Sequence, residues 1–280
     1  MNLWRYIRTF RNWAIIFFNV YRKNFSFYVE YRDGRKVKVL GQAHLYFLSF
    51  DPKDLQYDPN SDVLSFNFNG NSVKFKGALN NGDVGSIFGE LCYDIDVSGK
   101  VVLDIGANIG DSAVFYSLKG ATKVIAFEPA KENFSLLLEN IRLNNLSEKI
   151  IPLNKGISAM DHLIKLPLNI SGTMIDVIKN QSSEGNDVEL ISIEKVIKEY
   201  KPQIIKIDCE GCEYEIFASL TIDSLQCIEI IHGEFHGNGF NAIDEKLQSA
   251  GFKTTYKHLK STGLFVAFNN SMCNNLKKNS

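Results

Sequence analysis

The stretch Val101-Val-Leu-Asp-Ile-Gly-Ala-Asn-Ile-Gly-Asp111 decides the fold of this chain. Apolar residues that suit a buried parallel strand lead into Asp104, and a turn that contains Gly106 and Gly110 follows. A strand that breaks at glycines and re-enters as a helix presents backbone N–H groups and a positive helix end to a ligand. The sequence therefore predicts an open α/β sheet with a ligand site beyond the end of this strand.

The spacing within the turn separates the candidate ligands. A dinucleotide fold requires G-x-G-x-x-G, whereas this turn carries Asn108 at the middle position and Asp104 two residues before the first glycine. A carboxylate there disfavours a pyrophosphate and favours a ligand with a cationic, amino-acid-like end, such as S-adenosylmethionine. We expect Asp104 to attract the ammonium group of that ligand, directly or through water, and Gly106 to let the chain pass close to it. A glycine turn of an ordinary α/β protein is the alternative.

A second acidic residue follows the next predicted strand, Thr122 to Phe127. Glu128 stands at the end of this strand, and Pro129 ends the ladder. A carboxylate at this place can accept hydrogen bonds from both hydroxyl groups of an adenosine ribose. The alternative interpretation is a surface glutamate.

Two further strand ends carry polar residues. Asp208-Cys-Glu-Gly211 follows the predicted strand Gln203 to Ile207. We predict that Asp208 lies nearest the reacting groups and that Glu210 orients the acceptor or takes its proton. Alternatively, Glu210 caps the helix that starts near Cys212.

The strand Cys227 to Ile231 ends in His232-Gly-Glu-Phe-His236. In an extended chain His232, Glu234 and His236 share one face, where they can supply a base or bind a divalent ion together with Asp208. Exposed strand-end polar residues are the alternative. We predict His232 and Glu234 as catalytic residues and no metal ligand.

The two motifs Asp104-Ile-Gly-Ala-Asn-Ile-Gly110 and Ile205-Lys-Ile-Asp-Cys-Glu-Gly-Cys-Glu213 together resemble the FkbM family of S-adenosylmethionine-dependent O-methyltransferases. The similarity covers roughly residues 89 to 217. The resemblance implies a Rossmann-like, seven-stranded class I methyltransferase sheet that is preceded here by an N-terminal helix and a β-hairpin extension. It also places a glutamate, Glu90, shortly before the first core strand, where it could reach the bound cofactor. A solvated charge on a helix is the alternative. The predicted cofactor-binding residues are Glu90, Asp104, Gly106, Ala107, Asn108, Gly110, Glu128, Pro129 and Asp208.

The resemblance implies methyl transfer to a hydroxyl group of a small-molecule, glycan or lipid-linked glycan acceptor. The rivals are a scaffold that binds S-adenosylmethionine without turnover and a methyltransferase directed at nitrogen. The second rival predicts an Asn/Asp-Pro-Pro-aromatic motif, which the sequence lacks. A nicotinamide dehydrogenase is disfavoured by Asn108.

Size, charge and cysteine content limit the other classes. With 280 residues, 45% of them hydrophobic, the chain can bury a full core. A net charge of −1 argues against DNA or RNA as the main partner. Five cysteines without framework spacing predict a cytoplasmic protein, with Cys209 and Cys212 as buried thiols rather than a zinc or redox pair.

The N-terminal part differs in character from the rest. Residues 1–23 contain basic residues but no acid, and their apolar residues gather on one side of a helical wheel. This helix either docks on the catalytic domain as a lid or lies on an anionic membrane surface. Hairpins are predicted at Phe27 to Leu40 and at Val63 to Lys76. We therefore expect an extension for acceptor or membrane contact at 1–85, a methyltransferase domain at 86–270 and a flexible tail at 271–280.

Overall fold

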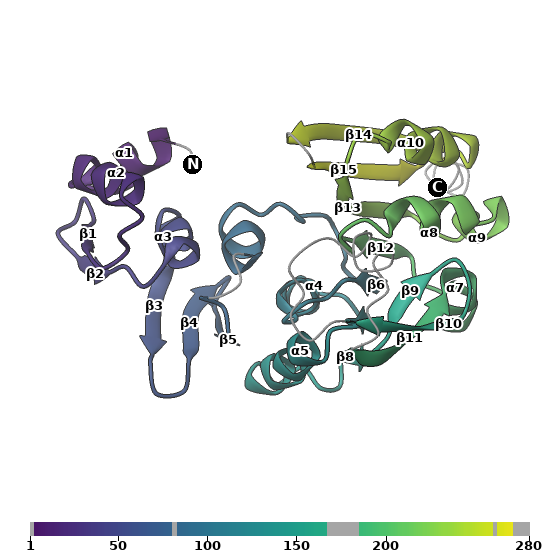
Figure 1. The fold of residues 1–280 in the computed structure, drawn as a ribbon, viewed down its shortest axis with the longest axis horizontal. Coiled ribbons are helices and arrows are strands. Elements are labelled where there is room, and N and C mark those ends of the chain that lie inside the picture. Colours follow the sequence, from purple (N-terminus) through teal and green to yellow (C-terminus); the bar gives the residue numbers. More distant parts are fainter. Residues whose placement is uncertain (1–2, 80–82, 167–184, 260–261, 271–280) are drawn as a thin grey trace. The chain divides into compact units, whose positions relative to one another are not determined.

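A computed structural model describes residues 3–79, 83–166, 185–259 and 262–270 (Figure 1). The chain divides into two compact units, Met1–Asp94 and Ile95–Ser280, so the observed boundary lies nine residues after the predicted one at 85. The predicted tail, 271–280, and residues 167–184 lie outside the described residues.

The N-terminal segment forms two helices, not the single helix that we predicted. Helix α1 spans Leu3–Thr9 and helix α2 spans Trp13–Tyr21. Between them the side chain of Asn12 donates to the carbonyl of Tyr28 at 2.8 Å and accepts from the N–H of Glu30 at 2.9 Å. Because these bonds tie the segment to a neighbouring strand, the helix is interrupted there. No described helix has the length and apolar character needed to cross a bilayer.

The first predicted hairpin is confirmed. Strands β1 (Tyr28–Glu30) and β2 (Lys36–Lys38) pair antiparallel, with Val29 opposite Val37. One side of the two helices packs on this hairpin and on helix α3 (Gln42–Leu48), within the first unit. The buried residues of this core are Tyr6, Phe10, Ile16, Val29, Tyr31, Val39, Leu45 and Leu48.

The second predicted hairpin is also confirmed, although it has a third strand. Strands β4 (Val63–Phe68) and β5 (Asn71–Lys76) pair antiparallel, and β3 (Lys53–Asp58) pairs with β4. The turn signals Asp51-Pro52 and Asp58-Pro59 flank β3 closely. A short π-helix, η1 (Gly85–Gly89), follows, and Phe88 packs with Phe66, Phe68 and Phe75.

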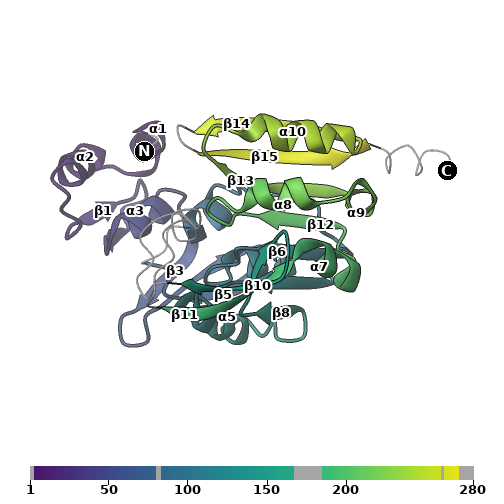
Figure 2. The same ribbon diagram turned by 45° about the vertical axis from the view of Figure 1, so that its right-hand side comes forward.

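The second unit contains the predicted seven-stranded sheet (Figure 2). Its strand order is β14-β15-β13-β12-β6-β7-β8, and all neighbours are parallel except those of β15. The antiparallel pair of β14 and β15 closes the sheet. The strands are β6 (Val101–Ile105), β7 (Lys123–Phe127), β8 (Ile150–Leu153), β12 (Ile204–Ile207), β13 (Ile230–His236), β14 (Phe252–Leu259) and β15 (Thr262–Asn269).

Strand order reverses between β6 and β12. On one side of this point the sheet continues from β6 to β7 and β8, and on the other side it continues from β12 to β13. Helices cover both faces of the sheet, with α4 and α5 on one face and α7, α8 and α10 on the other (Figures 1 and 2). In such a doubly wound sheet the ligand site lies beyond the carboxyl ends of the strands at the reversal. These helices are α4 (Asp111–Leu118), α5 (Lys131–Leu143), α7 (Ile193–Tyr200), α8 (Glu213–Ser219) and α10 (Phe240–Ser249); α9 (Ile222–Gln226) is a short helix between α8 and β13.

A smaller sheet packs beside the large one in the second unit. Strands β10 (His162–Leu166) and β11 (Asn186–Ser192) pair antiparallel, and β11 pairs parallel with β9 (Gly156–Ser158). Leu166, Val188 and Leu190 form its own small core.

Candidate functional site

The glycine-containing turn joins β6 to α4 with three residues in the left-handed region. Gly106 has φ +77°, Asn108 has φ +47° and Gly110 has φ +88°. The N–H groups of Gly106 and Ala107 donate to the carbonyl of Phe127 at 3.0 and 2.9 Å, which anchors the turn to the end of β7. Asparagine tolerates this conformation better than most residues, so the Asn of the motif has a conformational role here.

The two sequence motifs meet at the strand reversal. The N–H of Asp208 donates to the carbonyl of Ile105 at 3.0 Å, so the end of β12 lies directly beside the end of β6. A Cβ added to Gly106 would lie 2.9 Å from the carbonyl carbon of Asp208 and closer still to its oxygen. Only glycine fits this position, because two backbone segments approach there too closely for a side chain.

Asp104 is fully buried and already has partners. Its Oδ2 accepts from the hydroxyl of Ser112 at 2.6 Å, and its Oδ1 lies 3.3 Å from Nζ of Lys206. Lys206 also donates to the carbonyl of Gly106 at 2.7 Å. The pair thus ties β6, β12 and the turn together, and the attraction of Asp104 to a ligand ammonium stays a prediction.

Lys206 was not among the predicted site residues. Burial acts to lower the pKa of this ammonium, but the charges of Asp104, Asp208 and Asp111 outweigh burial and raise it above its ordinary value. The signal in the sequence was a single lysine within the otherwise apolar strand Ile204–Ile207, since lysine is almost never fully buried unless it is paired.

Glu128 occupies the end of β7 as predicted. It is only 5% exposed, and its two carboxylate oxygens accept from the N–H groups of Asn108 and Ala130, both at 2.8 Å. Burial raises the pKa of Glu128 to about 7, against the lowering effect of these hydrogen bonds. The side chain of Asn154 donates to the carbonyl of Glu128 at 2.9 Å and to the carbonyl of Pro129 at 3.2 Å. Glu128 therefore joins the glycine turn to the end of the neighbouring strand.

The turn after β12 contains a disulfide between Cys209 and Cys212, so the prediction of two buried thiols was wrong. Both cysteines are half-buried. The spacing C-x-x-C brings the two sulfur atoms together because the chain turns sharply between them, with Glu210 at φ +56° and Gly211 at φ +111°.

Glu213, not Glu210, satisfies the backbone of this turn. Its Oε1 accepts from the N–H groups of Cys209 and Gly211, both at 3.2 Å, and the residue is fully buried. The alternative in which Glu210 caps the helix is thereby corrected. Glu210 instead points its carboxylate at His236, with Oε2 3.1 Å from Nε2.

His236 lies between two carboxylates. Its Nδ1 is 3.1 Å from Oε1 of Glu213, and its Nε2 faces Glu210. Burial acts to lower the pKa of His236, but the hydrogen bonds to Glu210 and Glu213 raise it to about 10. The same contact lowers the pKa of Glu210. The two carboxylates therefore favour the protonated imidazole. We had placed it on the right face but had not selected it as a catalytic residue.

The two predicted catalytic residues of β13 lie in different environments. His232 is buried, and burial together with the charge of Lys206 lowers its pKa to about 4. Glu234 is half-buried, and burial together with the charge of Asp208 raises its pKa. The structure therefore brings Glu234 close to Asp208 and leaves His232 in the sheet interior.

Glu90 belongs to the first unit, directly after η1. It accepts a hydrogen bond from the hydroxyl of Tyr46 and lies 3.6 Å from the guanidinium of Arg5. Its role in cofactor binding stays a prediction.

Comparison with known proteins identifies the family. The model of the family described as "Methyltransferase FkbM domain" matches residues 104–254, more than half of the chain. The chain belongs to the FkbM methyltransferase family. The match begins at Asp104 of the glycine turn and extends into β14, so it includes both motifs and the β13 strand end. Membership confirms the predicted cofactor, S-adenosylmethionine.

Among its relatives, this FkbM protein is 32% identical over 143 residues to the hexuronic acid methyltransferase AglP of Haloferax volcanii, a match that covers 49% of this chain. The chain spans little more than half, 56%, of AglP. It is 26% identical over 208 residues to the methyltransferase sdnD of Sordaria araneosa, covering 60% of this chain and 80% of sdnD.

Solved structures with a similar chain course are more distant in sequence. A putative transferase of Pyrococcus horikoshii, PH0793, is 15% identical, with a TM-score of 0.44 over 74% of this chain and 71% of its own. P. horikoshii TYW2 in complex with MeSAdo is 16% identical, with a TM-score of 0.42 over 75% of this chain and 72% of its own.

Proposed function

We propose that this FkbM methyltransferase transfers a methyl group from S-adenosylmethionine to a hydroxyl oxygen of a glycan or small-molecule acceptor. The observation that carries the proposal is the junction of the two motifs, where Gly106 and Asp208 lie in backbone contact at the strand reversal. Methyl transfer within the family is established, whereas the choice of oxygen and of acceptor is the proposal. The name of AglP, a hexuronic acid methyltransferase, supports a sugar acceptor.

The residues of the junction fit the donor. Each oxygen of Glu128 accepts one backbone hydrogen bond and has a lone pair left for a ribose hydroxyl. The left-handed turn from Gly106 to Gly110 keeps backbone rather than side chains at the strand end. Ala107, Asn108 and Pro129 would complete this cofactor side. When bound, S-adenosylmethionine supplies an electrophilic methyl group on a sulfonium.

The acceptor side requires a group that takes the hydroxyl proton. Glu234 suits this role best, because its raised pKa makes it a better base than an ordinary carboxylate. His236 is already protonated, and Glu210 is held in its charged form by His236, so neither is a good base. Asp208, beside Glu234, would orient the hydroxyl, and in-line positioning would supply much of the rate.

A labelled-methyl assay tests this proposal. The purified protein is incubated with ¹³C-methyl S-adenosylmethionine and a panel of free and lipid-linked hexuronic acid glycans, and the product is examined by NMR. A methyl ether on a hydroxyl oxygen supports the proposal, and a methyl ester on the hexuronate carboxylate contradicts it. A methyl carbon bonded to nitrogen contradicts the oxygen assignment, and donor binding without transfer to any glycan favours the scaffold alternative. Glu245→Gln, an exposed change on α10, is the matched control for carboxylate variants.

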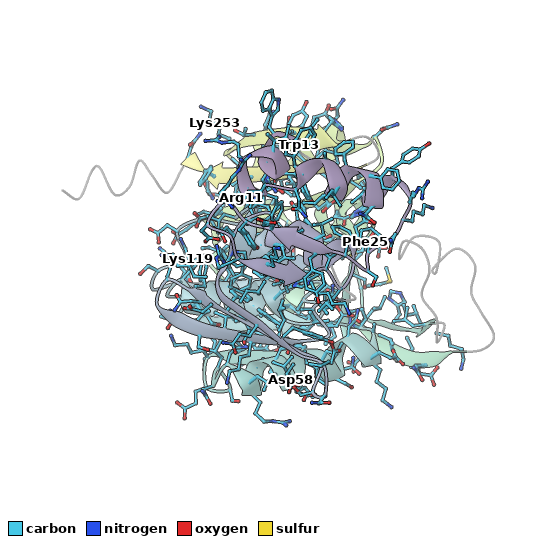
Figure 3. All side chains as sticks on the ribbon, turned by 90° about the vertical axis from the view of Figure 1, so that its left-hand side faces the viewer. Arg11, Trp13, Phe25, Asp58, Lys119 and Lys253 are labelled. Atoms are coloured by element: carbon cyan, nitrogen blue, oxygen red, sulfur yellow. A yellow bond between two sulfur atoms is a disulfide. The ribbon has the colours of Figure 1, made fainter. Side chains whose placement is uncertain are left out.

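Exposed aromatic residues of the first unit support a second part of the proposal, peripheral binding to an anionic membrane. Helix α2 buries Ile16 in its own unit but leaves large apolar side chains in solvent. Figure 3 shows the side chains of this unit, with Trp13 and the neighbouring Arg11 labelled. The exposed apolar residues of the two helices are Leu3, Trp4, Trp13, Ile15, Phe17, Phe18 and Tyr21, and the basic residues beside them are Arg8, Arg11, Arg22 and Lys23.

Aromatic residues flanked by arginine and lysine match the headgroup region of an anionic bilayer. In vesicle co-sedimentation we expect binding to phosphatidylserine-containing vesicles and weak binding to pure phosphatidylcholine. The double change Phe17→Ser/Phe18→Ser should reduce binding by roughly tenfold or more. Leu163→Ser, which removes an exposed leucine of the second unit, should not. Equal sedimentation of wild type and the double variant would contradict membrane contact through α2.

A further inference from the structure

Three side chains from two neighbouring strand ends converge beyond the sheet. Asp208 and Glu210 follow β12, and His236 ends β13. One donor atom from each of the three lies within 4.8 Å of the others. Among the described residues, this is the group whose donor atoms lie close enough to bind one ion.

The separation of two of these donor atoms suits neighbouring ligands of an octahedral divalent cation. Two bonds of about 2.1 Å at a right angle put adjacent donor atoms about 3 Å apart, and opposite donor atoms about 4.2 Å apart. Nε2 of His236 and Oε2 of Glu210 are 3.1 Å apart, as expected for adjacent ligands. All three donor atoms lie within 4.8 Å of one another, which is close to the span of one coordination sphere.

Glu213 orients the imidazole for such a role. Its buried Oε1 lies 3.1 Å from Nδ1 of His236 and is itself fixed by two backbone N–H groups of the turn. A carboxylate that accepts the Nδ1 proton directs the Nε2 lone pair toward a metal, an arrangement common behind metal-binding histidines. The Cys209–Cys212 disulfide restrains the turn that carries both Glu210 and the backbone donors to Glu213.

The charges around the group favour a cation. Asp208, Glu210 and Glu213 are joined by Glu234, because Ile207 pairs with Gly233 and the next residues along the two strands are Asp208 and Glu234. The ammonium of Lys206 faces Asp104 and Gly106 within the sheet.

We propose that Asp208, Glu210 and His236 bind one divalent cation of the Mn²⁺ class. Two carboxylate oxygens and one imidazole nitrogen form a mixed ligand set that suits Mn²⁺ better than Ca²⁺, which prefers oxygen ligands alone. The ion binds Nε2 of His236 and Oε2 of Glu210 as neighbouring ligands. Its remaining positions are open to water or to oxygen atoms of an acceptor, which makes it a binding site next to Glu234.

Titration of the full chain with MnCl₂ tests the site, with free Mn²⁺ measured by its solution EPR signal. The protein is first treated with a chelator and desalted, and no S-adenosylmethionine is added. We expect loss of free Mn²⁺ signal that saturates at one ion per chain. Glu210→Gln and His236→Gln should each weaken binding by at least tenfold, and Glu213→Gln, a positioning change, by 10- to 100-fold. The control Glu245→Gln should bind as the wild type does.

Glu210 is more than half exposed, so its replacement leaves the fold intact and keeps the test decisive if a His236 or Glu213 variant fails to fold. Absence of saturable binding by the wild type at millimolar Mn²⁺ would overturn the proposal. Equal affinity of the wild type and Glu210→Gln would overturn it as well. Because the donor is left out, failure of this test leaves the proposed methyl transfer standing, and failure of methyl transfer leaves this test valid.

Discussion

Replacement of Lys206 by methionine tests how the buried ion pair organises the junction. Lys206 and Asp104 are 3% and 0% exposed, and Nζ lies 3.3 Å from Oδ1 of Asp104. Removing the cation leaves a buried carboxylate without a compensating charge, which typically destabilises a protein by about 3–5 kcal/mol. The variant also loses the hydrogen bond to the carbonyl of Gly106. We therefore expect Lys206→Met to lower the free energy of unfolding by about 4 kcal/mol.

The double variant Asp104→Asn/Lys206→Met should recover most of this loss. A neutral asparagine can still accept the hydroxyl of Ser112, and removing both charges together is often neutral for stability. In a double-mutant cycle the two positions should couple by about 2–3 kcal/mol.

Urea denaturation followed by circular dichroism measures these values, and Lys198→Met on the exposed side of α7 is the control, with a change within about 0.5 kcal/mol. A loss below about 1 kcal/mol for Lys206→Met, or a double variant no more stable than the single one, would refute this reasoning.

Three further predictions concern single groups of the site. Burial raises the pKa of Glu128 from its ordinary 4.5 to about 7. The protonated carboxyl therefore contributes roughly 3 kcal/mol to the free energy of unfolding below pH 4.5, and this contribution is lost as the pH rises to 7. Glu128→Gln should remove this pH dependence, measured by urea unfolding. A wild type and Glu128→Gln with parallel pH profiles would contradict the burial effect. Reduction of the Cys209–Cys212 disulfide should lower stability by roughly 2 kcal/mol, seen by calorimetric scanning with and without reductant, and the scan of Cys209→Ser/Cys212→Ser should not respond to reductant. Glu234→Gln should lower kcat about 100-fold with unchanged donor affinity, whereas an unchanged kcat would remove Glu234 as the base.

The parts of the site that could be predicted from sequence depend on local chain geometry. Gly106, Gly110 and Glu128 each follow an apolar strand within a few residues, so the strand pattern alone places them at the sheet edge. The motifs that contain Asp104 and Asp208 each follow a parallel strand, so the same rule puts them at one edge of the sheet. The hydrogen bond from the N–H of Asp208 to the carbonyl of Ile105 shows that the two strand ends lie side by side. The prediction of a seven-stranded sheet came from the family resemblance.

Other features depend on partners that are distant in the chain. Lys206 on β12 pairs with Asp104 on the neighbouring strand β6. No local sequence pattern shows that these two charged residues are partners. Glu213 and His236 are 23 residues apart, and only the packing of α8 beside β13 brings them within 3.1 Å. Similarly, the break between α1 and α2 depends on Asn12 meeting the edge of β1, which the helical periodicity of residues 1–23 does not show.

Isothermal titration calorimetry of the purified chain with S-adenosylmethionine measures most directly whether the edge formed by β6 and β12 is a donor site. We predict saturable binding at one site per chain, and a loss of at least tenfold in affinity for Gly106→Ala, because the added methyl group pushes the carbonyl of Asp208 away from the turn. Absence of binding by the wild type at millimolar concentration, or equal affinity of the two proteins, would contradict this assignment.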